Sequence, residues 1–186
     1  MAQVPTGSTF YIASAYGSAK TVTIVTNATE AVVTAVAHGF SNGDVVEMTS
    51  GWGRLNKRHF EIESVLTDSF VLSGEDTTNT TFYPVGTGIG SVRKATTFTQ
   101  ITSVMNPQSS GGDPKTVTYK FVESDVEYSI NDGFGATSYT MELDADALGS
   151  AGYTALKSLT QVQTDTCLKV VTRSGSRVYQ PCTVAL

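Results

Sequence analysis

The chain has 186 residues, a length that fits one ordinary domain or a domain that carries a small second module. Only 16% of the residues are charged, and Thr, Ser, Val and Gly are abundant, which favours sheets over helical bundles. The formal net charge of −5 gives no excess of Lys and Arg, so a protein that grips DNA through a basic face is disfavoured.

No stretch of the sequence approaches the roughly 20 consecutive apolar residues needed to cross a bilayer. Residues 1–7 also lack the basic-then-apolar order of a signal peptide. We therefore expect no membrane association, and synthesis in the cytoplasm. Cys167 and Cys182 are the only cysteines, too few for a disulfide scaffold or for a four-ligand zinc site without His38 or His59.

The N-terminal third reads as short strands separated by turns. Strands are predicted over residues 9–14 and 21–26, with a turn near Gly17 between them. From residue 27 to residue 94 short strands alternate with glycine turns, a spacing that predicts a small closed barrel. Its strands are expected at residues 31–37, 45–49, 59–66, 70–73 and 90–93.

The predicted strands lengthen after residue 95, beginning with one over residues 96–105. Residues 106–114, with the sequence NPQSSGGDP, are predicted to form an exposed loop at the tip of a hairpin. The strands expected over residues 115–122 and 126–130 carry apolar residues of opposite parity, so a bulge or turn must lie near residues 123–125. Tyr139, Met141 and Leu143 define a further strand.

One helix is predicted after Leu143, with Asp144 or Asp146 as its N-cap. Its apolar stripe comprises Leu148, Gly152, Ala155, Leu156, Leu159 and Val162. Residues 168–172 and 177–184 are expected to close the chain as a hairpin. A two-residue turn there, at Ser174 and Gly175, would place Cys167 opposite Cys182, and we expect both to be reduced, partly buried thiols.

Catalytic constellations are nearly absent from the sequence. His38 and His59 each lack a second histidine at ligand spacing, so both are interpreted as turn or strand-edge residues. Residues 86–90, GTGIG, have glycines like a phosphate loop, but no helical pattern follows them. Trp52 lies between two glycines, and a barrel-plugging or loop-anchoring role is favoured over an exposed binding aromatic. We predict no enzyme activity, no cofactor, and no catalytic, cofactor-binding or metal-binding residues.

Residues 32–76 resemble a small β-barrel module found in phage virion proteins. The module is similar to the barrel in the first catalytic-cysteine half-domain of ubiquitin-activating enzymes. The resemblance implies a scaffold module, inserted at residues 27–94, without a catalytic role. The matching segments are His38-Gly39-Phe40, Gly43-Asp44-Val45-Val46, Leu55-Asn56, Phe60-Glu61-Ile62, Phe70-Val71-Leu72 and Gly74-Glu75-Asp76.

The remaining residues, 1–26 and 95–186, resemble the tail tube protein family of long-tailed phages, the siphophages. The shared order is strands, a long hairpin loop, more strands, one helix after Leu143 and a final hairpin. The resemblance implies a tail-tube-type β-sandwich or barrel core with one packed α-helix. It also implies a structural virion protein, the major tail tube subunit, which self-assembles into stacked hexameric rings around a channel for DNA ejection.

The same resemblance implies the partners and the location of the protein. It would act in the virion tail after synthesis in the host bacterial cytoplasm. Its partners would be further copies of the chain and other tail proteins, such as the tape measure and terminator proteins. DNA would pass through without specific binding.

Two sets of residues are candidates for contacts in such a tube. An acidic lining would repel the DNA backbone and keep sliding barriers low, and Glu123, Asp125 and Glu127 are the candidate channel-lining residues because they alternate on one strand face. Contacts between stacked rings are expected from the polar arm at residues 1–7 and from the loop. The loop residues are Asn106, Pro107, Gln108, Ser109, Ser110, Gly111, Gly112, Asp113 and Pro114.

Two alternative functions remain open from the sequence. One is another phage structural protein, such as a tail terminator, baseplate or head–tail joining protein. The other is a cell-surface carbohydrate-binding β-module, in which Trp52, Phe82 and Tyr83 would supply stacking aromatic rings. A hydrolase is disfavoured, because no nucleophile and base occur in a recognisable spacing.

Overall fold

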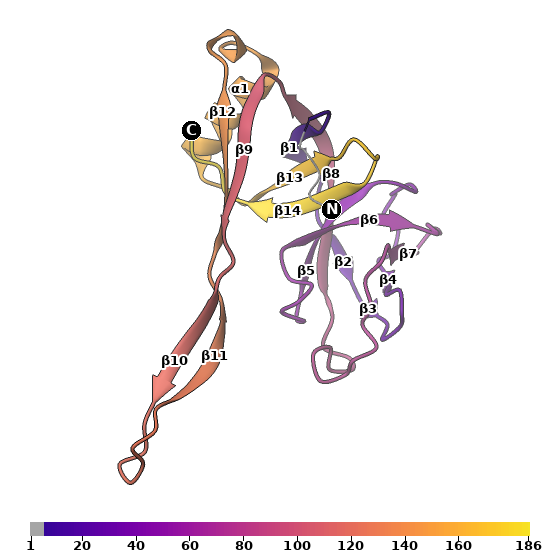
Figure 1. The fold of residues 1–186 in the computed structure, drawn as a ribbon. Helices are drawn as coiled ribbons and strands as arrows, with labels where there is room; N and C mark the ends of the chain where they lie inside the picture. Colours follow the sequence, from indigo (N-terminus) through magenta and orange to yellow (C-terminus); the bar gives the residue numbers. More distant parts are fainter. Residues whose placement is uncertain (1–5) are drawn as a thin grey trace. The chain divides into compact units, whose positions relative to one another are not determined.

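The computed structural model describes residues 6–186, which form two compact units (Figure 1). The first unit contains the described residues up to Thr102 together with Ala147–Leu186, and the second unit is Ser103–Asp146. Strands dominate both units and an α-helix completes the first, so the predicted mainly β fold is confirmed. Most of the predicted N-terminal arm, residues 1–5, lies outside the described residues.

The first unit is built on a 10-stranded antiparallel sheet. Along the sheet the order is β14-β13-β1-β8-β5-β6-β7-β4-β3, and β2 pairs with β8. The strands are β1 (Thr9–Tyr16), β2 (Lys20–Val22), β3 (Ile24–Val25), β4 (Val32–Thr34), β5 (Val45–Ser50), β6 (Arg58–Glu63), β7 (Ser69–Leu72), β8 (Gly90–Ile101), β13 (Thr166–Val171) and β14 (Arg177–Cys182).

Strand β8 is the element that the rest of the first unit shares. Its N-terminal part pairs with β5 on one side and β2 on the other, whereas its C-terminal part pairs with β1. The sequence predicted two separate strands here, at residues 90–93 and 96–105, and this was wrong. The Thr-rich alternation is continuous with the strand before it, and the chain leaves β8 only at Thr102. The chain does not reverse near Gly17, because β1 and β2 run along the same strand in the same direction.

Strands β2 to β8 enclose their own apolar core. The run from β2 to β3 pairs with β8 at its start and with β4 at its end, which closes the strands into a ring. The division into a core of residues 1–26 and 95–186 and an inserted module of residues 27–94 stays a prediction, and its second boundary falls inside β8. The buried residues of this core are Val22, Val25, Ala31, Val33, Ala35, Val46, Met48, Trp52, Leu55, Phe60, Ile62, Phe70, Leu72, Tyr83 and Val92.

Helix α1 (Ala151–Val162) packs on β8 and β1. Its N-cap is Ser150, whose hydroxyl accepts a hydrogen bond from the backbone N–H of Tyr153 at 3.2 Å, so the predicted Asp144 or Asp146 cap was wrong. Asp144 instead accepts from the backbone N–H of Asp146, in the short 3₁₀ turn η1 (Ala145–Ala147) that precedes the helix. The sequence prediction thus placed the start of the helix at the 3₁₀ turn, one turn too early.

The C-terminal hairpin differs from its prediction by one residue of register. Three residues, with Gly175 at a φ of +87°, form its loop, because Thr172 N–H bonds to the carbonyl of Ser176. Cys167 therefore lies opposite Pro181, and Cys182 lies opposite Thr166. Both cysteines are free, as predicted, but the expected opposition of Cys167 and Cys182 was wrong.

The second unit consists of two strand pairs in one long hairpin. Strand β9 (Val104–Gly111) pairs with β12 (Thr137–Leu143), and β10 (Pro114–Tyr119) pairs with β11 (Tyr128–Phe134). Gly135 donates its backbone N–H to the carbonyl of Asp113 at 2.8 Å, at the interruption between the two pairs. The part of the chain that the structure describes contains no helix long and apolar enough to cross a membrane.

The predicted loop at residues 106–114 is largely strand, so that prediction was wrong. Pro107 is tolerated because a bulge places it and Asn106 opposite a single residue, where the ladder is interrupted. Pro114 is the first residue of β10, another position where a missing N–H costs little. The tip of the hairpin lies instead between Tyr119 and Tyr128, where the predicted turn near residues 123–125 is confirmed.

Because α1 packs closely on β8, we predict that a glycine-to-alanine change in this helix destabilises the protein, the opposite of its usual effect. Alanine normally stabilises a helix by about 1 kcal/mol relative to glycine. At Gly152, however, a Cβ atom would lie 2.4 Å from the carbonyl oxygen of Gln100 on β8. Gly152→Ala should therefore lower the melting temperature, because overpacking typically costs about 1–3 kcal/mol. The exposed Ser158→Ala in the same helix is the control, and a Gly152→Ala protein at least as stable as the parent would contradict this packing.

Candidate functional site

The end of the hairpin in the second unit presents an apolar face. Val117 lies opposite Ile130 and Tyr119 lies opposite Tyr128, so the two strands place these side chains on one side. The rings of Tyr119 and Tyr128 stack with centroids 5.6 Å apart, and Phe121 packs edge-on against Tyr119 at 5.4 Å. All five side chains are nevertheless between 38% and 58% exposed. Isolated two-stranded hairpins are marginally stable, so this face needs a partner to bury it.

The three candidate channel-lining carboxylates lie at the tip of this hairpin. Glu123, Asp125 and Glu127 occupy the connection between β10 and β11, and all three are outside the strands. The predicted alternation along one strand face was therefore wrong, because β11 begins only at Tyr128. The apolar pattern identified the strand, but it did not locate the strand's first residue.

The net negative charge of the chain resides in the second unit. Residues 103–146 contain eight carboxylates and two lysines, a net charge of −6, whereas the rest of the chain contains nine carboxylates and ten basic residues, a net charge of +1. Among residues 6–186 none of those eight carboxylates forms an ion pair. They are Asp113, Glu123, Asp125, Glu127, Asp132, Glu142, Asp144 and Asp146.

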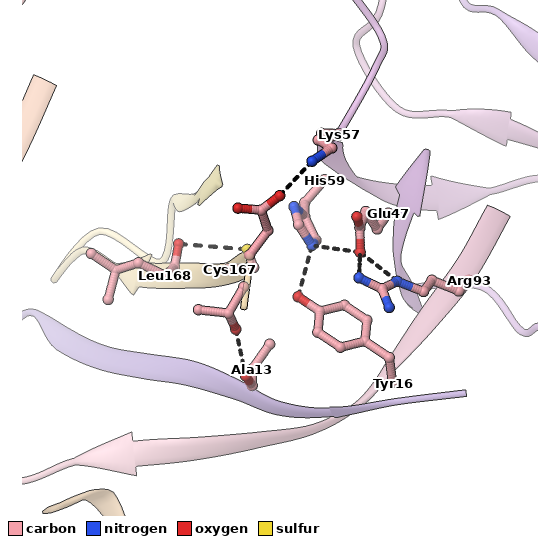
Figure 2. A network of polar contacts seen from close by, with 10 residues as sticks. Ala13, Tyr16, Glu47, Lys57, His59, Arg93, Cys167 and Leu168 are labelled. Atoms are coloured by element: carbon pink, nitrogen blue, oxygen red, sulfur yellow. Dashed lines mark hydrogen bonds and ion pairs between the residues drawn. The ribbon is translucent and has the colours of Figure 1, made fainter. Parts of the chain in front are cut away.

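The first unit, in contrast, places charge in a buried network that joins four strands (Figure 2). Glu47 on β5 is buried, and its Oε2 accepts a hydrogen bond from Nε of Arg93 on β8 at 2.6 Å. His59 on β6 is also buried; its Nε2 lies 2.9 Å from the hydroxyl of Tyr16 on β1 and 3.9 Å from Glu47 Oε2. The Arg93 guanidinium lies over the Tyr16 ring, 4.3 Å from its centroid.

Burial sets the protonation of the network. Loss of water raises the pKa of Tyr16, so its hydroxyl stays protonated where it hydrogen-bonds to His59. Burial, together with the Arg93 charge, lowers the pKa of His59 to about 4, so the ring is neutral at pH 7. Burial likewise raises the pKa of the Cys167 thiol to about 12, which makes it a poor nucleophile.

Further polar contacts join β6 to the C-terminal hairpin. Arg177 and Tyr179 on β14 both bond to Glu61 on β6, the tyrosine hydroxyl at 2.9 Å. Lys57, just before β6, pairs with Asp165, just before β13, at 2.6 Å (Figure 2). The sequence reading missed this network, although Glu47 inside the apolar run of β5 was a signal, since buried carboxylates require partners.

The remaining sequence candidates have structural roles. Trp52 is buried and its indole N–H lies 2.8 Å from the Pro84 carbonyl oxygen and 2.9 Å from Thr87 Oγ1, which confirms the loop-anchoring interpretation. Tyr83 is buried as well, so only Phe82 of the three proposed sugar-stacking aromatics is exposed.

Both histidines are buried. His38 follows a turn, and its Nδ1 accepts from Phe40 N–H at 3.0 Å, whereas His59 is the second residue of β6 and lies opposite Glu47 of β5. Within residues 6–186 no group of three or more His, Cys, Asp or Glu side chains could hold a metal ion.

The chain matches one family model of known proteins. The family model for phage tail tube proteins, TTP, matches residues 50–186, well over half of the chain. The matched segment contains the whole hairpin unit, helix α1 and the C-terminal hairpin. No curated protein matches the chain.

The buried network predicts that removing the charge of Glu47 on β5 costs more stability than removing the charge of Glu63 on β6. Glu47→Gln should lower the free energy of unfolding by roughly 1.5–3 kcal/mol, the range for hydrogen bonds to charged groups. Glu63→Gln on β6 is the matched control, because the described residues give Glu63 no ion pair. Urea unfolding of both variants measures the difference, and equal effects would contradict a structural role for Glu47.

Proposed function

The chain belongs to the phage tail tube protein family, and we propose on this premise that it self-assembles into stacked hexameric rings that form the channel for DNA ejection. The coarser function follows from family membership: it is a structural protein of a phage tail. The proposal adds the self-assembly, the ring number, the siphophage tail type and the passage of DNA. Neighbouring copies and other tail proteins, such as tape measure and terminator proteins, are the proposed partners.

The observation that carries the proposal is the hairpin of the second unit. Each of its four strands has one paired edge and one edge without a neighbour in the described residues. Unpaired strand edges join readily to further strands, and soluble proteins usually blunt or cover them. Here the edges are long, and the apolar face formed with Val117, Tyr119 and Tyr128 is exposed. Copies of the same chain would supply strands and apolar surface of matching length, and ring closure would remove the open edges.

The proposed contacts between stacked rings keep their sequence positions but change their structural description. Residues 106–114 would make these contacts as the end of β9 and the start of β10, not as a flexible loop. The strands at this point are held by Ser110 and Ser138, whose hydroxyls lie 2.8 Å apart. The arm at residues 1–7 is proposed for the same contacts, by its polarity alone.

The acidic tip of the hairpin is proposed to line the channel. Glu123, Asp125 and Glu127 have no ion pair within the described residues, so their charge is uncompensated. Ring symmetry would multiply each carboxylate by the number of subunits and produce bands of negative potential. Such bands repel phosphate and oppose tight binding of DNA to the wall.

The sugar-binding alternative loses its main support. A carbohydrate platform needs exposed aromatic rings, whereas Trp52 and Tyr83 are buried against each other with centroids 5.2 Å apart. The Arg54 guanidinium covers the ring of Phe82 at 3.6 Å from its centroid. We therefore propose no second function.

Self-assembly is tested by electron microscopy of the concentrated protein. The parent chain should form long tubes, and the double variant Tyr119→Ser with Phe121→Ser should not. The two rings pack on each other and on Tyr128, so the free energy of unfolding should fall by about 0.5–1.5 kcal/mol for each change, and circular dichroism checks that the variant is folded. Leu66→Ser, another exposed apolar side chain, is the control in the first unit and should leave tubes intact. Parent protein that stays monomeric at all concentrations would refute self-assembly, and tubes from the double variant would exclude this face as an interface.

The lining role is tested in an intact phage. Changing Glu123, Asp125 and Glu127 together to lysine should leave tail assembly normal but slow DNA ejection, because lysines bind phosphate and release counterions. The isosteric neutral set, Glu123→Gln, Asp125→Asn and Glu127→Gln, should have a smaller effect. Unchanged ejection by the lysine variant, measured as DNA released over time, would place these residues away from the channel.

A further inference from the structure

The hydrogen bond between Tyr16 and His59 joins strands that no backbone ladder connects. The sheet order is β1-β8-β5-β6, so two strands lie between the tyrosine and the histidine along the sheet. The side chains nevertheless meet at 2.9 Å, which requires the sheet to curl (Figure 2). This bond can therefore form only while the sheet is curved enough to bring β6 close to β1.

The groups around the histidine act on its protonation in different ways. The hydroxyl of Tyr16 on β1 lies 2.9 Å from Nε2 and can donate to that nitrogen or accept from it. The other ring nitrogen, Nδ1, is buried and has no hydrogen-bond partner among the described residues. Glu47 on β5 is 3.9 Å from Nε2, but its Oε2 is already held by Arg93 on β8.

A second proton on the ring would leave one buried donor unpaired. Both ring nitrogens would then carry hydrogen, and Tyr16 could accept from Nε2, but Nδ1–H would have no acceptor among the described residues. The new cation would also share one buried carboxylate with Arg93. Burial of an additional charge without its own partner is costly.

The Cys167 thiol lies in the cluster behind this bond. It is fully buried on β13, with Ala13, Val45 and Ala95, and the rings of Tyr16 and Tyr179 pack against that cluster. Tyr179 is held in turn by Glu61. A reagent can reach the thiol only when this cluster opens.

From this geometry we propose that His59 makes the joint between β6 and β1 acid-sensitive: protonation of the ring adds an unpaired donor and a charge to the buried network and opens the cluster around Cys167. The proposal concerns the single subunit and does not depend on tube assembly. It assigns His59 a role as a positioning residue whose neutral ring holds the curvature of the sheet.

The pH range follows from the direction of the shift. Burial first, and the Arg93 charge second, lower the pKa of His59 to about 4 from an ordinary value near 6.5. A group whose folded pKa is depressed in this way binds more protons in the open state between those values. The stabilising effect of the neutral ring is thus complete above pH about 6.5 and is lost as the pH falls toward about 4.

The test measures labelling of Cys167 by 4,4′-dithiodipyridine in the full-length Cys182→Ser protein, where Cys167 is the one remaining thiol. Each rate is divided by the rate for guanidinium-unfolded protein at the same pH, which removes the pH dependence of the reagent. Between pH 7.5 and 4.5 the normalised rate should rise roughly 70-fold through His59 alone. With His59→Gln, which can still accept from Tyr16 but cannot be protonated, most of this rise should disappear.

A second variant keeps the proposal testable if His59→Gln does not fold. Tyr16→Phe removes the hydrogen-bond partner of Nε2, so labelling at pH 7.5 should already be raised, while the acid-dependent rise should remain. Glu47→Gln removes the nearby carboxylate but keeps the histidine, and should retain an acid-dependent rise. Equal pH profiles for the parent and His59→Gln would overturn the proposal, and so would unchanged labelling of Tyr16→Phe at pH 7.5.

Discussion

The backbone ladder of β8 is the constraint on which the first unit depends. Twelve residues of one strand pair with β5, β2 and β1, and the helix α1 packs on it as well. Because every backbone N–H and C=O of a buried strand needs a partner, breaking β8 would leave unpaired groups in two apolar cores at once. The ring of strands around Trp52 and the cluster around Cys167 therefore both depend on the pairing of β8.

The two units handle charge in opposite ways. The first unit keeps Glu47 inside the protein and compensates it with Arg93, and it ties the half-exposed Arg177 to Glu61. A pair with a buried carboxylate, such as Glu47 with Arg93, stabilises little in net terms, but removal of one partner is costly, so the pair favours one arrangement of the strands. The second unit leaves its carboxylates exposed and, among the described residues, without ion-pair partners. The first pattern suits a fixed fold, and the second suits a surface whose partners come from outside.

The class of fold and most elements could be predicted from the sequence. The predictions were wrong where an element's limits depend on its pairing with strands distant in sequence. Strand periodicity located β1, β5, β7 and both C-terminal strands to within a few residues, because alternation reports burial directly. It could not show that β8 is continuous, since the change of texture at residue 95 reflects a change of partner and not a break. The proline-containing segment at residues 106–114 was misread because a bulge hides Pro107 from the ladder. The His59 network joins four strands distant in sequence, and no local pattern encodes it.

The position of β1 has a consequence for the order of events during synthesis. This strand lies between β8 and β13, and Phe10 pairs with Val170. A ribosome adds about 5–20 residues per second, so on the order of ten to thirty seconds separate the appearance of these two partners. Contacts so distant in sequence also slow the folding that follows. The sheet can close only when nearly the whole chain has left the ribosome, so neighbouring nascent chains on one messenger RNA remain incomplete while they are crowded together.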